Sequence, residues 1–109
     1  MSDTIITTTP KLDAIEAGPR TWPSKSRLRC ADGTLLSVIT GAMLCCTPRD
    51  DTGPYEKVEV GTWVPTPDSW AEYADYSHSN DESGDHLRVH GYVPVTVVRE
   101  FIAAHGGEA

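Results

Sequence analysis

The chain has 109 residues, of which 39% are hydrophobic and 23% are charged, and its formal net charge is −7. This length suits one domain with a modest core, and the apolar content excludes a chain that is disordered throughout. A negative net charge argues against nonspecific nucleic-acid binding, because phosphate backbones select basic surfaces. The first residues lack the pattern of a secretory signal and no apolar run is long enough to span a bilayer, so we expect a cytoplasmic protein.

The charges are distributed unevenly along the chain. Residues 20–49 contain five basic residues and one acidic residue, whereas residues 50–86 contain ten acidic residues and one basic residue. The second segment therefore predicts an acidic surface that attracts a basic partner.

The first expected elements are an N-terminal arm and a β-hairpin. Residues 1–20 contain two prolines and no sustained periodicity, which predicts a loose arm attached to a single domain formed by residues 21–109. The Asp32-Gly33 pair separates SRLRCA from TLLSVIT and favours a hairpin with a type I′ turn. The second of these runs is apolar on both faces, so we expect it to be a central strand.

Further strands and one helix follow. The run AMLCC predicts a short strand that Pro48 ends, and YEKVEVGTW and LRVHGYV predict two more strands. Residues 64–86 predict a long acidic loop with one helical turn near residues 69–76. Apolar residues at helical spacing after Pro94 predict a helix that ends at His105 and Gly106. The predicted class is α+β, a small antiparallel sheet of about four to five strands with a C-terminal helix packed on it.

Three segments together resemble a known group of proteins. The segments DGTLLSV, CTPRDDTGPYEKVEVG and HGYVPVTVVREFIAAHGG contain a DG hairpin, a C-[ST]-P-R turn, a VEVG strand and a GYVP helix start. They look like small uncharacterised proteins that bacteriophages and prophages encode, often in actinobacteria. The resemblance implies an accessory protein in the cytoplasm of the host cell and assigns no catalytic residue. The chain departs from the group in its paired Cys45-Cys46 and in its acidic loop at 78–86.

The cysteines and histidines form no recognisable metal or redox motif. Zinc ligands usually come in pairs two to four residues apart, whereas Cys45 and Cys46 are adjacent and would point to opposite sides of a strand. A reactive thiol needs positive charge nearby, and Arg49 is the nearest cation along the chain. We interpret Cys30, Cys45 and Cys46 as core thiols, with metal binding or a dyad with His90 as the less favoured alternatives. The chain has no glycine-rich phosphate-binding fingerprint, so no cofactor is predicted.

The acidic segment supplies the preferred candidate site. Spaced carboxylates imitate the phosphates of nucleic acid toward a basic host protein, while interleaved aromatic rings anchor the contact. The predicted partner-binding residues are Asp68, Trp70, Glu72, Tyr73, Asp75, Asp81, Glu82 and Asp85. The alternative is that these charges are only solvated and that Trp70 and Tyr73 pack on the sheet.

A second candidate site would bind an anion. The Thr47 hydroxyl and the Arg49 guanidinium, joined by Arg27 or Arg29 from a nearby strand, suit the phosphate of a nucleotide. The alternative is that Arg49 pairs with Asp50, Asp51 or Glu59 and fixes the corner between two strands.

The sequence thus predicts a non-enzymatic protein that binds a host macromolecule and inhibits host defence or a nucleic-acid-handling system. The alternatives are a protein that binds small phosphorylated ligands or nucleotides, and a structural or virion-associated protein. The expected partner is a host protein with a basic surface, and neither direct nucleic-acid binding nor a membrane partner is expected.

Overall fold

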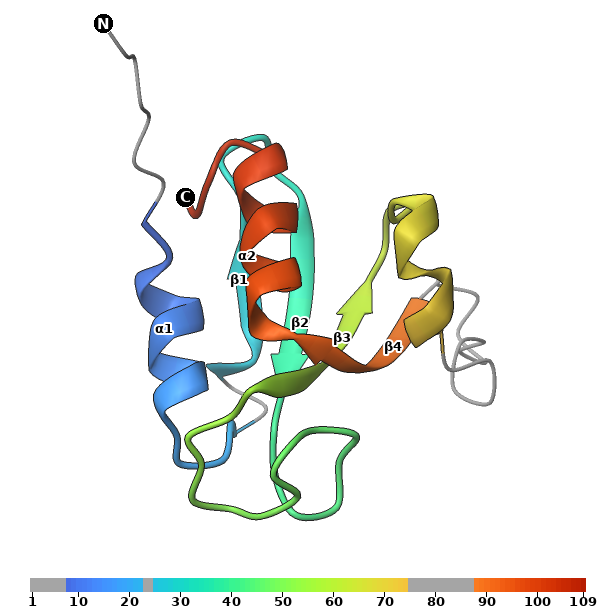
Figure 1. The fold of residues 1–109 in the computed structure, drawn as a ribbon. Coiled ribbons are helices and arrows are strands. Elements are labelled where there is room, and N and C mark those ends of the chain that lie inside the picture. Colours follow the sequence, from blue (N-terminus) through green and yellow to red (C-terminus); the bar gives the residue numbers. More distant parts are fainter. Residues whose placement is uncertain (1–7, 23–24, 75–87) are drawn as a thin grey trace, which may run out of the picture.

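A computed structural model describes residues 8–22, 25–74 and 88–109 (Figure 1). One antiparallel sheet has the order β1-β2-β3-β4, formed by β1 (Arg27–Arg29), β2 (Leu35–Ile39), β3 (Lys57–Thr62) and β4 (Arg88–Pro94). The helices are α1 (Pro10–Ala17), the short 3₁₀ helix η2 (Asp68–Tyr73) and the C-terminal α2 (Val95–Ala104). The sheet and α2 confirm the predicted α+β class.

The predicted hairpin forms between β1 and β2, but its turn differs from the predicted type. A type I′ turn requires positive φ at both central residues, and only Gly33 has it, with φ of +92°, while Asp32 does not. The Gly33 amide donates to the Cys30 carbonyl at 2.9 Å, and the Cys30 amide donates to Thr34 at 2.8 Å. These bonds define a type I turn followed by a left-handed glycine, which is a common hairpin connection of three residues.

Alternation along the strands separates a buried sheet face from an open one. On β2 the inward residues Leu36 and Val38 are fully buried, whereas the outward residues are only half-buried. Helix α2 packs on the buried face (Figure 1) and contributes Val95, Val98, Phe101 and Ile102 to the core. The periodicity that predicted α2 is therefore its core-facing stripe.

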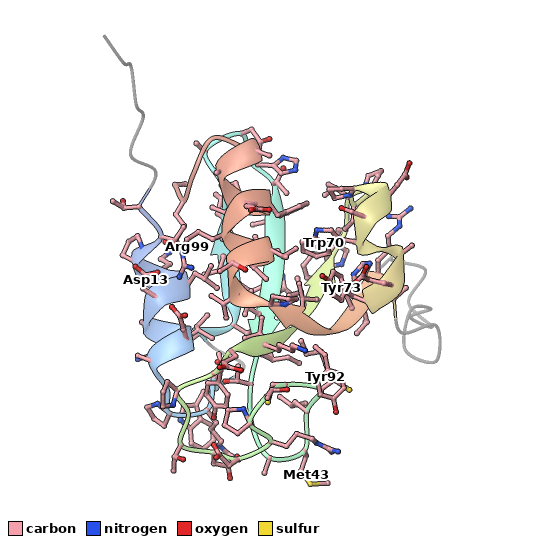
Figure 2. The ribbon with its side chains drawn as sticks, in the orientation of Figure 1. Asp13, Met43, Trp70, Tyr73, Tyr92 and Arg99 are labelled. Atoms are coloured by element: carbon pink, nitrogen blue, oxygen red, sulfur yellow. The ribbon has the colours of Figure 1, made fainter. Side chains whose placement is uncertain are left out.

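All three described helices lie on the same side of the sheet. Trp70 of η2 is buried against Phe101 of α2, with ring centroids 5.1 Å apart, and Arg99 of α2 pairs with Asp13 of α1 (Figure 2). Within the described ranges, the opposite face of the sheet carries no helix. None of these helices is long and apolar enough to cross a membrane.

Helix α1 occupies part of the segment that the sequence predicts to be a loose arm. Its eight residues make it marginal in isolation. The carboxylate of Glu108 accepts hydrogen bonds from the amides of Lys11 and Leu12, each at 3.0 Å, and so caps the start of the helix from the far end of the chain.

Arg99 provides the second attachment of α1. Its guanidinium donates to Asp13 at 2.8 Å, to Glu16 at 3.0 Å and to the Thr9 hydroxyl at 3.1 Å. The bond from Arg99, helped by the bond from Thr9, lowers the pKa of Asp13 below its ordinary value. Helix α1 is therefore fixed by residues that lie more than eighty positions away in sequence.

Residues 40–56 form an irregular corner, and the strand predicted at AMLCC is absent. Carboxylates in and beside this corner accept bonds from backbone amides: Asp51 from Ala42, Glu59 from Cys45, and Asp50 from Thr52 and Gly53. The Tyr55 ring is buried beneath the corner, and its hydroxyl donates to the Asp50 carbonyl at 2.8 Å. Within the run predicted as a strand, side chains thus bind the amides of Ala42 and Cys45, and carbonyls of the corner itself bind those of Leu44 and Cys46.

Candidate anion-binding site

A pocket lies between α1 and the segment that leads from α1 into β1. Its volume is about 620 Å³, which is within the range of small-molecule sites. Of the described residues that line it, four are basic and none is acidic, and the four are Lys11, Arg20, Lys25 and Arg27. None of these four forms an ion pair with a carboxylate of the described residues. The pocket is therefore a concentrated positive site on an acidic protein.

Local structure fixes the wall of the pocket that follows α1. Gly18 has φ of +84° and lies directly against the Thr52 carbonyl, where a Cβ would collide, so only glycine fits this close approach. The Arg20 amide then donates to the Asp51 carbonyl at 2.9 Å. The Thr21 and Thr40 hydroxyls are 2.9 Å apart. The segment that carries the cations is thus held by the corner at 40–56.

Trp22 presents an exposed ring beside these cations. Its side chain is 56% exposed, and the guanidinium of Arg20 lies 4.1 Å from the ring centroid. A cation–π contact at an exposed site contributes about 0.5–1 kcal/mol, so it orients the pair weakly and leaves the ring open to another planar group. The pocket combines positive charge with a stacking surface.

The predicted anion-binding residues do not come together as a group. Arg27 lines the basic pocket, whereas Arg49 is exposed in the corner and Thr47 pairs through its backbone with Lys57. Arg29 is exposed on β1, two residues beyond Arg27. Sequence reasoning missed Lys11, Arg20 and Lys25 as partners of Arg27. The basic residues on either side of Trp22 were a local signal that could have indicated Arg20 and Lys25. Lys11 had no such signal, because its position depends on a helix that the sequence did not predict.

The alternative prediction for Arg49 was a salt bridge that fixes the corner, and the described residues do not form it. Asp50, Asp51 and Glu59 accept bonds from backbone amides instead. The amides of Gly53 and Thr52 lower the pKa of Asp50. Arg49 therefore forms no ion pair with any carboxylate of the described residues.

The predicted acidic face divides between surface and core. Asp68 and Glu72 are exposed on η2, and Tyr73 is half-buried. Trp70 is only 2% exposed and packs on Phe101 and on His90, so it belongs to the core and cannot anchor a partner. This outcome corrects the prediction for Trp70. Asp75, Asp81, Glu82 and Asp85 lie outside the described residues.

Two of the three predicted core thiols are in the core, whereas Cys45 is only half-buried. Cys30 and Cys46 are buried, and burial raises the pKa of both thiols. The His105 ring lies 2.7 Å from Asp32 and ties the end of α2 to the hairpin turn. Bonds from Thr34, with a further bond from His105, lower the pKa of Asp32 to about 2. Among residues 8–22, 25–74 and 88–109, no three Cys, His, Asp or Glu side chains gather in a way that could hold a metal ion.

Comparison with protein families, with curated proteins and with solved structures found no match to this chain. The resemblance to phage-encoded proteins therefore stays a prediction. What the fold and the pocket define is a small α+β protein with a basic, tryptophan-containing pocket. Such a fold does not fix a function, which depends on the chemistry of that pocket.

Proposed function

We propose that this protein binds a phosphorylated ligand with a planar ring, such as a nucleotide, in the pocket between α1 and β1. The observation that carries the proposal is the convergence of Lys11, Arg20, Lys25 and Arg27 on one pocket beside the exposed ring of Trp22. Guanidinium and ammonium groups form strong charge-assisted hydrogen bonds to phosphate oxygens. The indole supplies a face on which a base can stack.

The net charge of −7 does not oppose this proposal at physiological salt. The screening length is then about 8 Å, so distant carboxylates act weakly on a ligand in the pocket. The four cations that line the pocket act at contact distance. Local charge therefore outweighs the total charge for a small anion.

The pocket favours binding over acid–base chemistry. None of its described lining residues is a cysteine, histidine, aspartate or glutamate. These residue types supply most general bases and nucleophiles. Ligand binding is therefore the role that we assign to this pocket.

Calorimetric titration with AMP, UMP and ADP, with inorganic phosphate as the ring-free anion, tests the proposal. Loss of one charge-assisted hydrogen bond costs about 1.5–3 kcal/mol, so Arg20→Gln should weaken nucleotide binding about tenfold or more. Trp22→Leu should weaken nucleotides but not phosphate, because stacking contributes about 1–3 kcal/mol per base.

Arg49→Gln is the matched control, since it also removes one exposed arginine but lies in the corner outside the pocket. It should leave the affinity unchanged. If wild type binds none of these ligands at millimolar concentration, or if Arg49→Gln weakens binding while Arg20→Gln does not, the proposal is wrong.

A second candidate is the predicted binding of a basic host protein through the acidic face. The exposure of Asp68 and Glu72 on η2 favours it, since both carboxylates are open to a partner. Asp68→Asn with Glu72→Gln should abolish capture of such a protein in a host pull-down, and Arg20→Gln should not. Equal capture by wild type and by the neutralised variant would exclude these two residues from the contact.

A further inference from the structure

The basic pocket continues onto the open face of the sheet through a shared residue. Arg27 lines the basic pocket and also a second pocket of about 400 Å³ on the open sheet face. The strand register places Arg27 opposite Ser37, Ser37 opposite Gly61, and Gly61 opposite Val89. These four residues form one row across all four strands. Its two central residues, Ser37 and Gly61, have small side chains or none, so the surface is low there.

A second arginine–tryptophan pair joins this row to Trp63, which directly follows β3. The guanidinium of Arg27 is 4.5 Å from the ring centroid of Trp63, and both residues line the sheet-face pocket. Arg20 with Trp22 and Arg27 with Trp63 therefore repeat the same combination of charge and ring on two adjoining sites. Among the described residues that line the second pocket, Glu59 supplies the one carboxylate, and this carboxylate accepts a bond from the Cys45 amide.

The combined site extends well beyond the basic pocket alone. Together the two pockets enclose roughly 1,000 Å³, which is the upper end of the range for a single small ligand. Proteins that bind single-stranded nucleic acid commonly use an extended surface on which cations alternate with aromatic rings. A duplex would offer its phosphates to the cations but would keep its bases stacked away from both rings.

We propose that the ligand is a short stretch of single-stranded nucleic acid that runs from the basic pocket across the open sheet face. Lys11, Arg20, Lys25 and Arg27 bind its phosphates, and one base stacks at Trp22 while another stacks at Trp63. This inference rests on the proposed function and extends it. It also revises the expectation from net charge that direct nucleic-acid binding is absent, because the relevant charge is that of this surface.

Fluorescence anisotropy with labelled oligonucleotides tests the inference. The probes are dT10 and rU10 for the two kinds of strand, a 10-base-pair duplex, and a ten-residue glutamate peptide for an acidic protein segment. We expect a single-stranded decamer to bind at least tenfold more tightly than UMP and than the duplex. If four phosphates are neutralised, doubling the salt concentration should weaken binding about sevenfold. Tighter binding of the peptide or of the duplex would overturn the inference.

The variants separate this inference from the proposed function. Trp63→Leu should weaken decamer binding about tenfold and UMP binding severalfold less, because UMP loses only the ring beside Arg27 and no stacking at Trp63. Trp63→Phe should restore most of the decamer affinity because it retains a stacking face. Because Trp63 is half-buried, thermal unfolding checks that each variant folds, and the exposed Arg27→Gln gives an independent loss of at least fivefold for the decamer.

Two outcomes are decisive. If UMP binds with the expected dependence on Arg20 and Trp22 but the decamer binds no more tightly, the inference fails and the proposed function stands. If neither UMP nor the decamer binds, both fail.

Discussion

Glu108 should stabilise the fold although it is the penultimate residue of the chain. Of the first four positions of α1, Pro10 has no amide hydrogen and the Asp13 amide donates to Thr9, which leaves the amides of Lys11 and Leu12. The Glu108 carboxylate accepts from both at 3.0 Å. Its removal leaves two helix-terminal donors without a protein partner.

The magnitude follows from the exposure of these two amides. A hydrogen bond to a charged group contributes about 1.5–3 kcal/mol, but loss of a helix cap usually costs about 0.5–2 kcal/mol because water reaches the vacated amides. Leu12 is fully buried and Lys11 is exposed, so Glu108→Ala should cost close to 2 kcal/mol. For a domain of this size that is about 9 °C in Tm. Glu108→Gln keeps one acceptor oxygen and should cost about half as much.

Urea unfolding and amide hydrogen exchange provide the measurement. Glu100→Ala is the matched control, because it also removes one carboxylate but from an exposed position on α2. It should change the free energy of unfolding by less than about 0.5 kcal/mol. In Glu108→Ala the Lys11 and Leu12 amides should exchange faster than in wild type. If both variants unfold at the same urea concentration and these amides keep their protection, Glu108 does not cap α1 and the reasoning is wrong.

The remaining predictions concern the core and its pH dependence. Tyr55→Phe removes the hydroxyl that donates to a corner carbonyl and should lower the free energy of unfolding by about 1 kcal/mol in urea titration, so an unchanged midpoint would contradict this role. Trp70→Ala should cost about 3–5 kcal/mol by the same assay, because the ring is buried between Phe101 and His90, and a cost below 1 kcal/mol would mean that η2 is not docked. Burial lowers the pKa of His90, so the unfolded chain takes up the proton first and stability should fall as the pH drops below about 6.5. His90→Leu should remove this part of the pH dependence, and an unchanged slope between pH 7 and 5 would refute it.

The elements that were predicted correctly carry their signals locally. The hairpin follows from a glycine between two apolar runs, and α2 follows from apolar residues at helical spacing that are buried in the fold. Both patterns reflect neighbours within about ten residues. The turn type was wrong because Asp32 keeps a negative φ and only Gly33 enters the left-handed region.

The elements that were missed depend on distant residues. Helix α1 has no side-chain cap of its own, since the Thr9 hydroxyl donates to Asp13 and the free amides donate to Glu108. The apolar run at 42–46 has the composition of a strand, but the carboxylates of Asp51 and Glu59 bind two of its amides and hold a corner. No local pattern encodes such contacts.

The same use of carboxylates explains how an acidic chain exposes a basic site. Asp50, Asp51, Glu59 and Glu108 direct their oxygens to backbone amides and so do not pair with arginines. Four of the nine lysine and arginine residues then line one pocket, and none of the four pairs with a carboxylate of the described residues. A count of charges along the sequence cannot register this, because it treats every carboxylate as available to neutralise a cation. Carboxylates that accept hydrogen bonds from amides stabilise the fold locally. The cations beside Trp22 and Trp63 therefore remain available to a negatively charged ligand.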